Sequence, residues 1–346
     1  MTTMPAASTV DQDRLIWLDA LRGLTLVLVV VGHVARGLHA AGMLDIPAYL
    51  RMDATLYSLH LPLLFVLSGY TFRASIAHKP FGATWKGRLL RIVRPYLVWT
   101  FITAGVMFAL STVVNQPLSA VDFLWILLLT PILPYSIFWF FYALIQCQSL
   151  LGWVAGRWTP TDRKLGLLAL ALAMVGQVLQ AAFGTIEPFL LTVFLKVFLF
   201  FTLGYLLAGR PELLGPRLML VAGFAALVCW SVFLMTEVGI EGPFGLLTGL
   251  AGCVFLFALL RVPLLWPVSA RILAPIYLLL AFLGVRSIEI FVMHVLFNGA
   301  ARVFLNAAGI HALGPHILFG SLAGVFGPIA AGFVLKKLKL SRALGL

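Results

Sequence analysis

Arg22 and His33 lie eleven residues apart inside the first apolar segment long enough to cross a membrane, in the run LDALRGLTLVLVVVGH. Eleven residues make three helical turns plus about 20°, so the two side chains share one helix face, about 16 Å apart along the axis. Arginine binds phosphate or carboxylate, and histidine can act as a general base near neutral pH. Because such groups are costly inside a membrane, the pair predicts a site for a long donor with an anionic end. The alternative is that Arg22 pairs with Asp19 and that His33 only ends the apolar stretch.

A second group of basic residues stands before the third apolar run, in KGRLLRIVRPYLVW. Arg88, Arg91 and Arg94 repeat at about one-turn spacing, and Pro95 suits a helix start or a kink. The arginines either bind the phosphates of a donor or anchor the cytoplasmic end of a membrane helix.

A third group lies in YSLHLPLLFVLSGY. His60 either lines a polar cavity or caps a helix end. Ser68 has no adjacent base in the sequence that would make it a nucleophile. Close helix packing at Ser68 and Gly69 is therefore the favoured interpretation.

Ionisable residues also fall inside two later apolar runs. Lys196 lies in FLKVFLFFTLGY, and Glu289 and His294 lie in GVRSIEIFVMHVLF. Intramembrane charges usually pair with one another, so we expect Lys196 and Glu289 to form a buried structural pair. A lone His294 is more typical of a satisfied interior histidine.

The composition predicts the class of protein. The chain has 346 residues, of which 62% are hydrophobic and 10% charged, and its mean hydropathy is +1.06. Such a chain has too few polar groups to cover a water-soluble globule, which predicts an all-α polytopic membrane bundle. The net charge of +12 sits mostly in short connections, which fits membrane topology and not a nucleic-acid partner. The three cysteines lie singly, so no disulfide framework or metal site is expected.

Charge also predicts the topology. Basic connections alternate with acidic or uncharged ones only if ten apolar runs cross the membrane, with both termini in the cytoplasm. Two further stretches, 121–134 and 264–283, are then interfacial or re-entrant pieces. This divides the chain into a polar cytoplasmic segment (1–14), a transmembrane domain (15–335) and a basic cytoplasmic tail (336–346). The ten runs lie near 15–40, 54–77, 95–115, 137–155, 164–184, 188–208, 217–236, 243–260, 286–306 and 315–335.

Taken in order, these motifs resemble the acyltransferase-3 family, which includes bacterial sugar and polysaccharide O-acetylases. The resemblance rests on LDALRG with VVVGH, then HLPLLFVLSGY, RLLRIVRPY, the WFFYAL run, FFTLGYLL and RSIEIFVMH. It extends over nearly the whole chain. The arginine and histidine with ten residues between them are the family's hallmark.

The resemblance implies an enzyme of the bacterial inner membrane. It would move an acyl group, expected to be acetyl, from acyl-CoA to a hydroxyl of a glycan or glycolipid, and it would hold no permanent cofactor. By position, His33 and Arg22 match the catalytic residues, while Arg88 and Arg91 match the arginines that bind the donor. The other motif positions are assigned to substrate binding: His60, Ser68, Trp139, Tyr142, Glu289 and His294.

Several alternatives stay open at this point. His33 either takes the proton of the acceptor hydroxyl or carries the acyl group itself. A transporter or flippase for a glycan or lipid would use similar intramembrane charges, although no internal repeat supports it. An N-acetyltransferase of an amino sugar is a further alternative.

Overall fold

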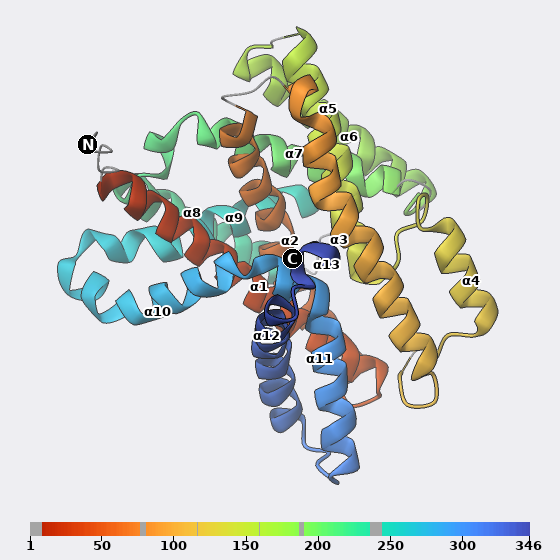
Figure 1. The fold of residues 1–346 in the computed structure, drawn as a ribbon. Helices are drawn as coiled ribbons and strands as arrows, with labels where there is room; N and C mark the ends of the chain where they lie inside the picture. The colour runs from red at the N-terminus through yellow and green to blue at the C-terminus, as the bar shows by residue number, and fades with distance from the viewer. Residues whose placement is uncertain (1–8, 77–80, 116, 159, 187–189, 236–243) are drawn as a thin grey trace, which may run out of the picture.

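The computed structural model describes residues 9–76, 81–115, 117–158, 160–186, 190–235 and 244–346, and within these ranges the chain is helical without strands. The predicted all-α membrane bundle is confirmed (Figure 1). The helices are α1 (Thr9–Ala40), α2 (Ile46–Ile76), α3 (Phe81–Ala109), α4 (Ala120–Leu129), α5 (Trp139–Trp158), α6 (Asp162–Phe183), α7 (Leu191–Ala208), α8 (Pro216–Met235), α9 (Gly245–Arg261), α10 (Pro267–Val285), α11 (Ser287–Ala307), α12 (Leu313–Lys337) and α13 (Ser341–Leu344).

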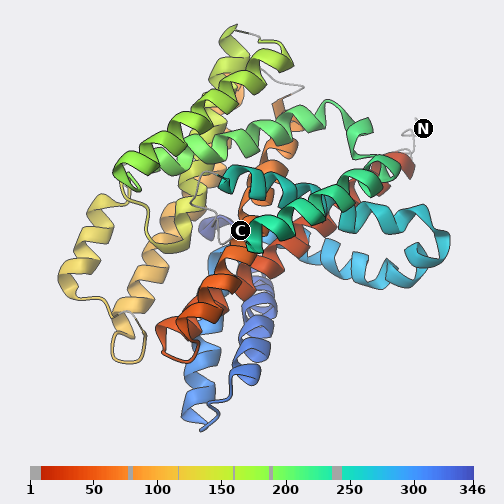
Figure 2. The same cartoon turned by 180° about the vertical axis from the view of Figure 1, so that it is seen from behind.

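Helices α1 and α2 form the centre of the bundle. Most of each apolar segment is buried, whereas α8 and α10 bury only a small share of theirs. Viewed from the front and from behind, α11 and α12 run together on one side of this centre, and α5, α6 and α7 lie on another (Figures 1 and 2). The two helices that carry most of the chemistry are therefore held from several sides.

Glycines let two helix pairs approach closely beside the site. A Cβ atom placed on Gly69 would lie 1.8 Å from the carbonyl oxygen of Phe201, and one on Gly204 would lie 1.8 Å from that of Val66. Only glycine fits such a backbone approach, so α2 and α7 cross there. This confirms the packing role predicted for Gly69.

Helices α1 and α10 cross in the same way. A Cβ atom on Gly23 or Gly284 would lie 1.9 Å from a carbonyl oxygen of the opposite helix, that of Leu280 or Asp19 respectively. The four residues also show that the two helices run antiparallel at this crossing. Gly23 follows Arg22 directly, so the crossing fixes the position of that arginine.

Ten helices of the described chain are long and apolar enough to cross a membrane, which matches the predicted number but not the predicted set. Residues 264–283 were expected to be interfacial or re-entrant. Instead, Pro267–Val285 is one helix of 19 residues and qualifies as a span, because Pro267 lies in its first turn and Pro275 is accommodated inside it. Conversely, α9 has only 17 residues and falls short, although 243–260 was predicted to cross. Helix α4 has 10 residues, too few to span, as expected for 121–134.

Basic connections that the sequence places on one side of the membrane do meet at one end of the bundle. Asp162, at the start of α6, lies 3.8 Å from Arg73 at the end of α2 and 3.5 Å from Arg210 after α7. Arg94 donates to the carbonyl oxygen of Ala343 in α13 at 3.2 Å. The connections after α2, α5 and α7 and the C-terminal segment therefore share one end, as the alternation of charge predicts.

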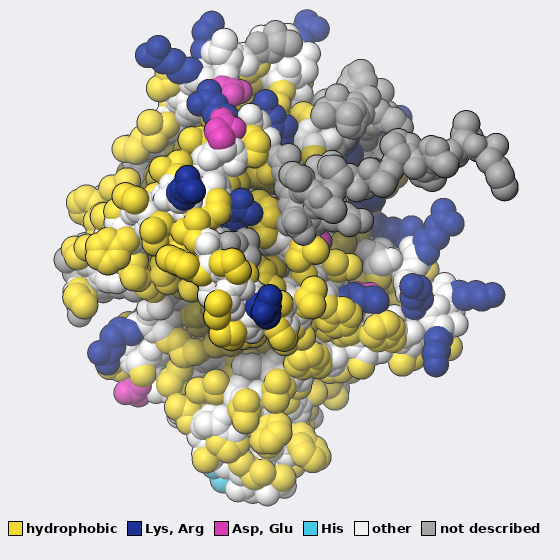
Figure 3. All heavy atoms as spheres, turned by 90° about the vertical axis from the view of Figure 1, so that its left-hand side faces the viewer, with side chains coloured by type: hydrophobic (Ala, Val, Ile, Leu, Met, Phe, Trp, Pro, Cys, Tyr) yellow, Lys and Arg dark blue, Asp and Glu magenta, His cyan; other side chains and the backbone are white. Residues whose placement is uncertain are grey.

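Hydrophobic side chains cover most of the face drawn in Figure 3, with many Lys and Arg at its upper and right-hand margins and a few scattered among the hydrophobic side chains. On α8, for example, Val221 and Phe224 are each 71% exposed. Apolar side chains at such exposure suit contact with lipid acyl chains. The protein is a multi-pass membrane protein.

Candidate active site

A cavity of about 350 Å³ lies between α1, α2, α3, α5 and α11, and we call it the arginine cavity. It brings together two groups that the sequence places 66 residues apart, Arg22 on α1 and Arg88 with Arg91 on α3. Its polar lining consists of Arg22, Ser68, Thr71, Ser75, Arg88, Arg91, Gln148 and Ser287. Three cations and several hydroxyls in one cavity suit a phosphate-bearing ligand.

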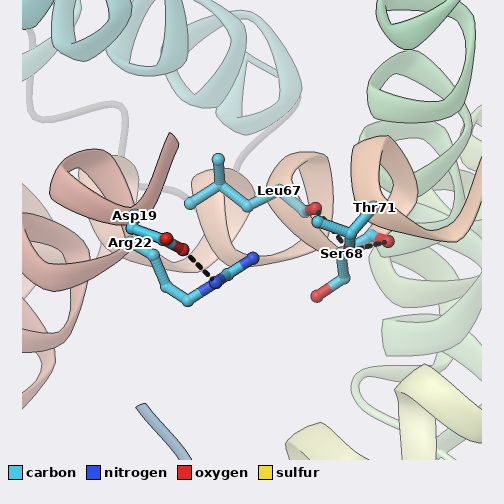
Figure 4. Close-up of polar contacts among 5 residues, drawn as sticks. All are labelled: Asp19, Arg22, Leu67, Ser68 and Thr71. Carbon is cyan, nitrogen blue, oxygen red and sulfur yellow. Dashed lines mark hydrogen bonds and ion pairs between the residues drawn. The ribbon is translucent and has the colours of Figure 1, made fainter. Parts of the chain in front are cut away.

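Arg22 points from α1 toward the turn of α2 that carries Ser68 and Thr71 (Figure 4). Its Nη1 donates to Asp19 at 2.7 Å, so the local ion pair expected as the alternative does form. The two side chains nevertheless stay about a quarter exposed. Arg22 is thus both paired and open to the cavity.

The Ser68 hydroxyl donates to the carbonyl oxygen of Leu64 at 2.7 Å, one turn back along α2. A hydroxyl that bonds to its own helix has no base to take its proton. This agrees with the expectation that Ser68 is not a nucleophile.

The three arginines of α3 have different surroundings. Arg88 bonds to the hydroxyl and the carbonyl oxygen of Ser75 at the end of α2. Arg91 donates through Nε to the carbonyl oxygen of Gly87 at 3.2 Å and lines the same cavity. Arg94 is absent from the cavity lining and binds α13 instead. The structure therefore separates two cavity arginines from one that holds the C-terminal segment.

His33 opens into a different cavity, of about 850 Å³, which we call the histidine cavity. Its polar lining consists of His33, Arg36, Asn115, Ser136, Asn298 and Arg302, and its other walls are mostly apolar side chains of α3 and α11. Arg22 and His33 lie on one continuous helix, so the predicted separation of about 16 Å along α1 holds. One face of α1 therefore serves both cavities.

The ring of His33 contacts the ring of His294 on α11, with centroids 5.0 Å apart. His294 is fully buried, and its Nδ1 lies 2.8 Å from the carbonyl oxygen of Phe291 and 3.1 Å from that of Ile290. Since carbonyl oxygens only accept, Nδ1 carries the hydrogen, and Nε2 of the neutral ring is left as an acceptor. Nε2 is buried and has no hydrogen-bond partner among the described residues. His294 is thus an interior histidine with one unsatisfied nitrogen beside His33.

A third cavity, of about 670 Å³, adjoins the histidine cavity and shares Arg36, Ser136 and Trp139 with it. We call it the side cavity. Its polar lining also includes Asp53, Tyr57, Gln180 and Lys196. Aromatic, amide and charged side chains around one cavity of this size suit the hydroxyls of a sugar.

Arg36 joins these two cavities, and sequence reasoning missed it. Its Nε and Nη2 donate to the two oxygens of Asp53 at 2.7 and 3.1 Å, and its Nη1 donates to the Tyr57 hydroxyl at 2.8 Å. The guanidinium also lies 4.1 Å from the Tyr57 ring centroid. This bidentate pair connects the end of α1 to the start of α2 and holds the junction in one geometry.

Two more residues were missed on α11. Asn298 and Arg302 follow His294 at intervals of four, so the three side chains form one stripe. Arg302 donates to the carbonyl oxygen of Gly37 on α1 at 3.0 Å. Asn298, between them, is 9% exposed, and its Nδ2 has no partner among the described residues. The four-residue spacing of polar residues in an apolar run is the signal that could have found this stripe.

Other predicted site residues lie outside these cavities. His60 is buried in the middle of α2 with its ring 5.0 Å from that of Tyr57, so it does not cap a helix end. A Cβ atom on Gly32 would lie 3.6 Å from it, which places it against α1 near His33. Tyr142 donates its hydroxyl to the carbonyl oxygen of Pro131 at 3.0 Å. Substrate binding by His60 and Tyr142 stays a prediction.

The predicted pair of Lys196 and Glu289 is wrong. Glu289 pairs with Arg286 at 3.1 Å and packs against Gly332, whereas Lys196 donates to Gln180. Each residue lies in the first turns of its helix. The start of α7 faces the side cavity and the start of α11 faces the arginine cavity, so the two charges lie at different ends of the bundle.

Metal ligation has no support in the described part of the chain, where no group of three or more His, Cys, Asp or Glu side chains could hold an ion. Cys147 and Cys253 are buried free thiols, and Cys229 is an exposed one.

Comparison with known proteins identifies the family of the chain. The chain belongs to the acyltransferase-3 family, because the model of that family's acyltransferase domain matches residues 15–333. Searches of curated proteins and of solved structures found no match. The family resemblance inferred from the ordered motifs is confirmed, and the protein is a membrane acyltransferase.

Proposed function

We propose that this membrane acyltransferase moves an acyl group, acetyl in the first place, from acyl-CoA to a hydroxyl of a glycan or glycolipid in a bacterial inner membrane. The observation that carries the proposal is that two residues on one face of α1 open into two different cavities. Arg22 opens into a cavity with two further arginines, and His33, three turns along the same face, opens into a larger cavity.

The donor end of the site is the arginine cavity. Arg22, Arg88 and Arg91 bind the phosphates of CoA there, because guanidinium groups match phosphate oxygens in charge and geometry. The long thin arm of CoA then extends along α1 and presents its thioester near His33. This arrangement uses the spacing of the two motif residues, and it gives Arg94, which lies outside the cavity, no part in donor binding.

The acceptor end consists of the histidine and side cavities. The side cavity offers Trp139 for stacking on a sugar ring, and Tyr57, Gln180 and the Arg36–Asp53 pair for its hydroxyls. The apolar walls of the histidine cavity suit a lipid tail or an alkyl aglycone. An acceptor that carries both parts, such as a glycolipid, fits the two cavities together.

In the reaction, His33 takes the proton of the acceptor hydroxyl as its oxygen attacks the thioester carbonyl carbon. A carbon–oxygen bond forms, and the carbonyl electron pair moves onto the carbonyl oxygen. When that pair returns, the carbon–sulfur bond breaks, and the proton passes from His33 to the departing thiolate. The products are the acyl ester and free CoA.

Purified protein in dodecyl maltoside, supplied with radiolabelled acetyl-CoA, tests the proposal. Label should appear as an ester on an envelope glycolipid extract or on the sugar hydroxyls of the detergent itself. His33→Ala should abolish this transfer and keep a normal melting temperature. The matched control is His311→Ala, which removes an exposed histidine between α11 and α12.

Three results would contradict the proposal. Full transfer by His33→Ala would show that His33 is not the base. Label found only on amines would indicate N-acylation. Envelope glycans that lose their location but keep their acetyl groups in cells without the gene would indicate transport.

A further inference from the structure

Acyl transfer from a thioester needs a hydrogen-bond donor at the carbonyl oxygen as well as a base. Negative charge develops on that oxygen as the acceptor attacks, and a preorganised donor in a site without bulk water stabilises it strongly. His33 is the base of the proposed function, on which this inference rests, so the donor must line the histidine cavity close to His33.

Most donors that line this cavity are already bound to the protein. Arg36 is held by Asp53 and Tyr57. Asn115 and Arg302 both donate to the carbonyl oxygen of Gly37, at 2.9 and 3.0 Å. Gly37 is one helical turn beyond His33, so these two donors converge on a point about 6 Å farther along α1. Ser136 and the indole of Trp139 also line the cavity, but Ser136 is exposed, and Trp139 is only partly buried and is shared with the side cavity.

Asn298 differs from these donors in burial and in partners. It is 91% buried, it lines the cavity, and its Nδ2 makes no hydrogen bond within the described residues. Its position follows from its neighbours on α11, because His294 contacts His33 and Arg302 reaches Gly37. Asn298 is halfway between those two residues and therefore lies beside the stretch of α1 that begins at His33.

An unpaired amide in such a place is costly. A buried donor without an acceptor costs about 1–3 kcal/mol, and native proteins retain few of them. A leucine of similar size would fill the site without that cost. The unsatisfied Nδ2 thus points to an acceptor that is present only when substrate is bound.

We propose that Asn298 is a further catalytic residue, whose side-chain amide donates a hydrogen bond to the thioester carbonyl oxygen as it becomes negatively charged. His33 and Asn298 then act on opposite partners of one step, the base on the acceptor hydroxyl and the amide on the acyl carbonyl.

The test compares Asn298→Leu and Asn298→Asp with the wild-type protein in dodecyl maltoside. Acetyl-CoA is the donor, and the detergent's sugar hydroxyls are the acceptor. Both variants lack the amide donor, and leucine also removes the unsatisfied polar group. Loss of one such donor lowers kcat by about 10²–10³-fold. The KM for acetyl-CoA should change little, because the carbonyl oxygen carries little charge before the reaction. The matched control is Asn306→Leu, two turns farther along α11 at an exposed position, which should keep wild-type kcat.

Stability separates this role from a structural one. Asn298→Leu should melt at the wild-type temperature or above it while kcat falls, since leucine replaces an unpaired amide. The inference is overturned if Asn298→Leu keeps kcat within twofold of wild type, or if its activity falls only in proportion to folded protein. A wild-type protein that transfers no acetyl group to the detergent or to an envelope glycolipid extract would instead overturn the proposed function.

Discussion

The close crossing of α2 and α7 at Gly69 should be as important for activity as for folding. Gly69 follows Ser68, and the same turn of α2 lines the arginine cavity. A Cβ atom at Gly69 would lie 1.8 Å from the carbonyl oxygen of Phe201, and real Cβ contacts are essentially never under 3.0 Å. Gly69→Ala must therefore move the two backbones apart by about 1.2 Å, because neither partner is a flexible side chain.

Two magnitudes follow from that displacement. Overpacking a well-packed interface costs about 1–3 kcal/mol, and a backbone clash belongs at the upper end of this range. A misplacement of about 1 Å in a reacting site costs on the order of 10²-fold in rate. We therefore expect Gly69→Ala to lower the melting temperature in detergent by several degrees. Its kcat for acetyl transfer should fall between 10-fold and 100-fold at saturating acetyl-CoA.

Gly105 on α3 provides the matched control, because a Cβ atom there meets no other atom within 4 Å. Gly105→Ala should be neutral or stabilise the protein by up to about 1 kcal/mol, the difference in helix propensity between glycine and alanine. If Gly69→Ala matched Gly105→Ala in both melting temperature and kcat, the crossing would tolerate a methyl group. Glycine at this crossing would then not be what positions the donor site.

Three more outcomes are expected. Arg91→Ala should weaken acetyl-CoA binding, measured by calorimetry, by about 10-fold, which corresponds to the lower end of the 1.5–3 kcal/mol of a charge-assisted hydrogen bond. Arg94→Ala should lower the melting temperature but not the affinity. Equal affinities of the two variants would mean that both arginines only anchor the helix in the membrane. Asp53→Asn, which breaks the ion pair with Arg36, should destabilise the protein by about 1–3 kcal/mol. This is less than the cost of about 3–5 kcal/mol for breaking a fully buried ion pair, because the two side chains are 23–32% exposed. Adding Arg36→Gln should then recover part of the loss, and strictly additive losses would argue against coupling. Gly309→Cys, in a background without native cysteines, should react with an impermeant maleimide in intact cells, and reaction only after permeabilisation would reverse the assigned orientation.

Much of the site follows from periodicity within single helices. Arg22 and His33 lie on one helix, so their spacing predicts a shared face, and α1 is continuous over both. The spacing of Arg88 and Arg91 likewise places both in one cavity. Such arguments need only helix geometry, which does not depend on how helices pack.

Pairing between helices could not be predicted in the same way. Glu289 was expected to pair with Lys196 because both lie inside apolar runs, but a place in the membrane does not say which helices are neighbours. The ion pair that forms, with Arg286, is local and has the i, i+3 spacing that a helix-face count would have found. Arg36 and Asp53 belong to two helices joined by a short turn, and only the tertiary packing shows that they converge.

The span assignments show a related limit. Alternation of charge predicts how many segments cross, and the part of the chain that the structure describes has ten suitable helices. It could not say which of two neighbouring segments crosses, because both 243–260 and 264–283 are apolar and Arg261 lies between them. Pro275 lies inside 264–283, and a membrane helix can accommodate such a proline when its surroundings satisfy the freed carbonyl group.

The two ends of the proposed site are separated by packed aromatic rings. Phe291 lines the arginine cavity, and its ring lies 5.1 Å from Phe140, 5.0 Å from Phe141 and 6.1 Å from His294. His294 in turn contacts His33 in the histidine cavity. Under the proposed function, the thioester must reach His33 from the arginine side, so the donor's arm has to pass or displace these rings. Phe140, Phe141 and Phe291 are all buried in the core, so they leave no open path between the two cavities in this structure. Under the proposed function, donor binding must therefore be coupled to a movement of these rings, and without the donor they separate His33 from the arginine cavity.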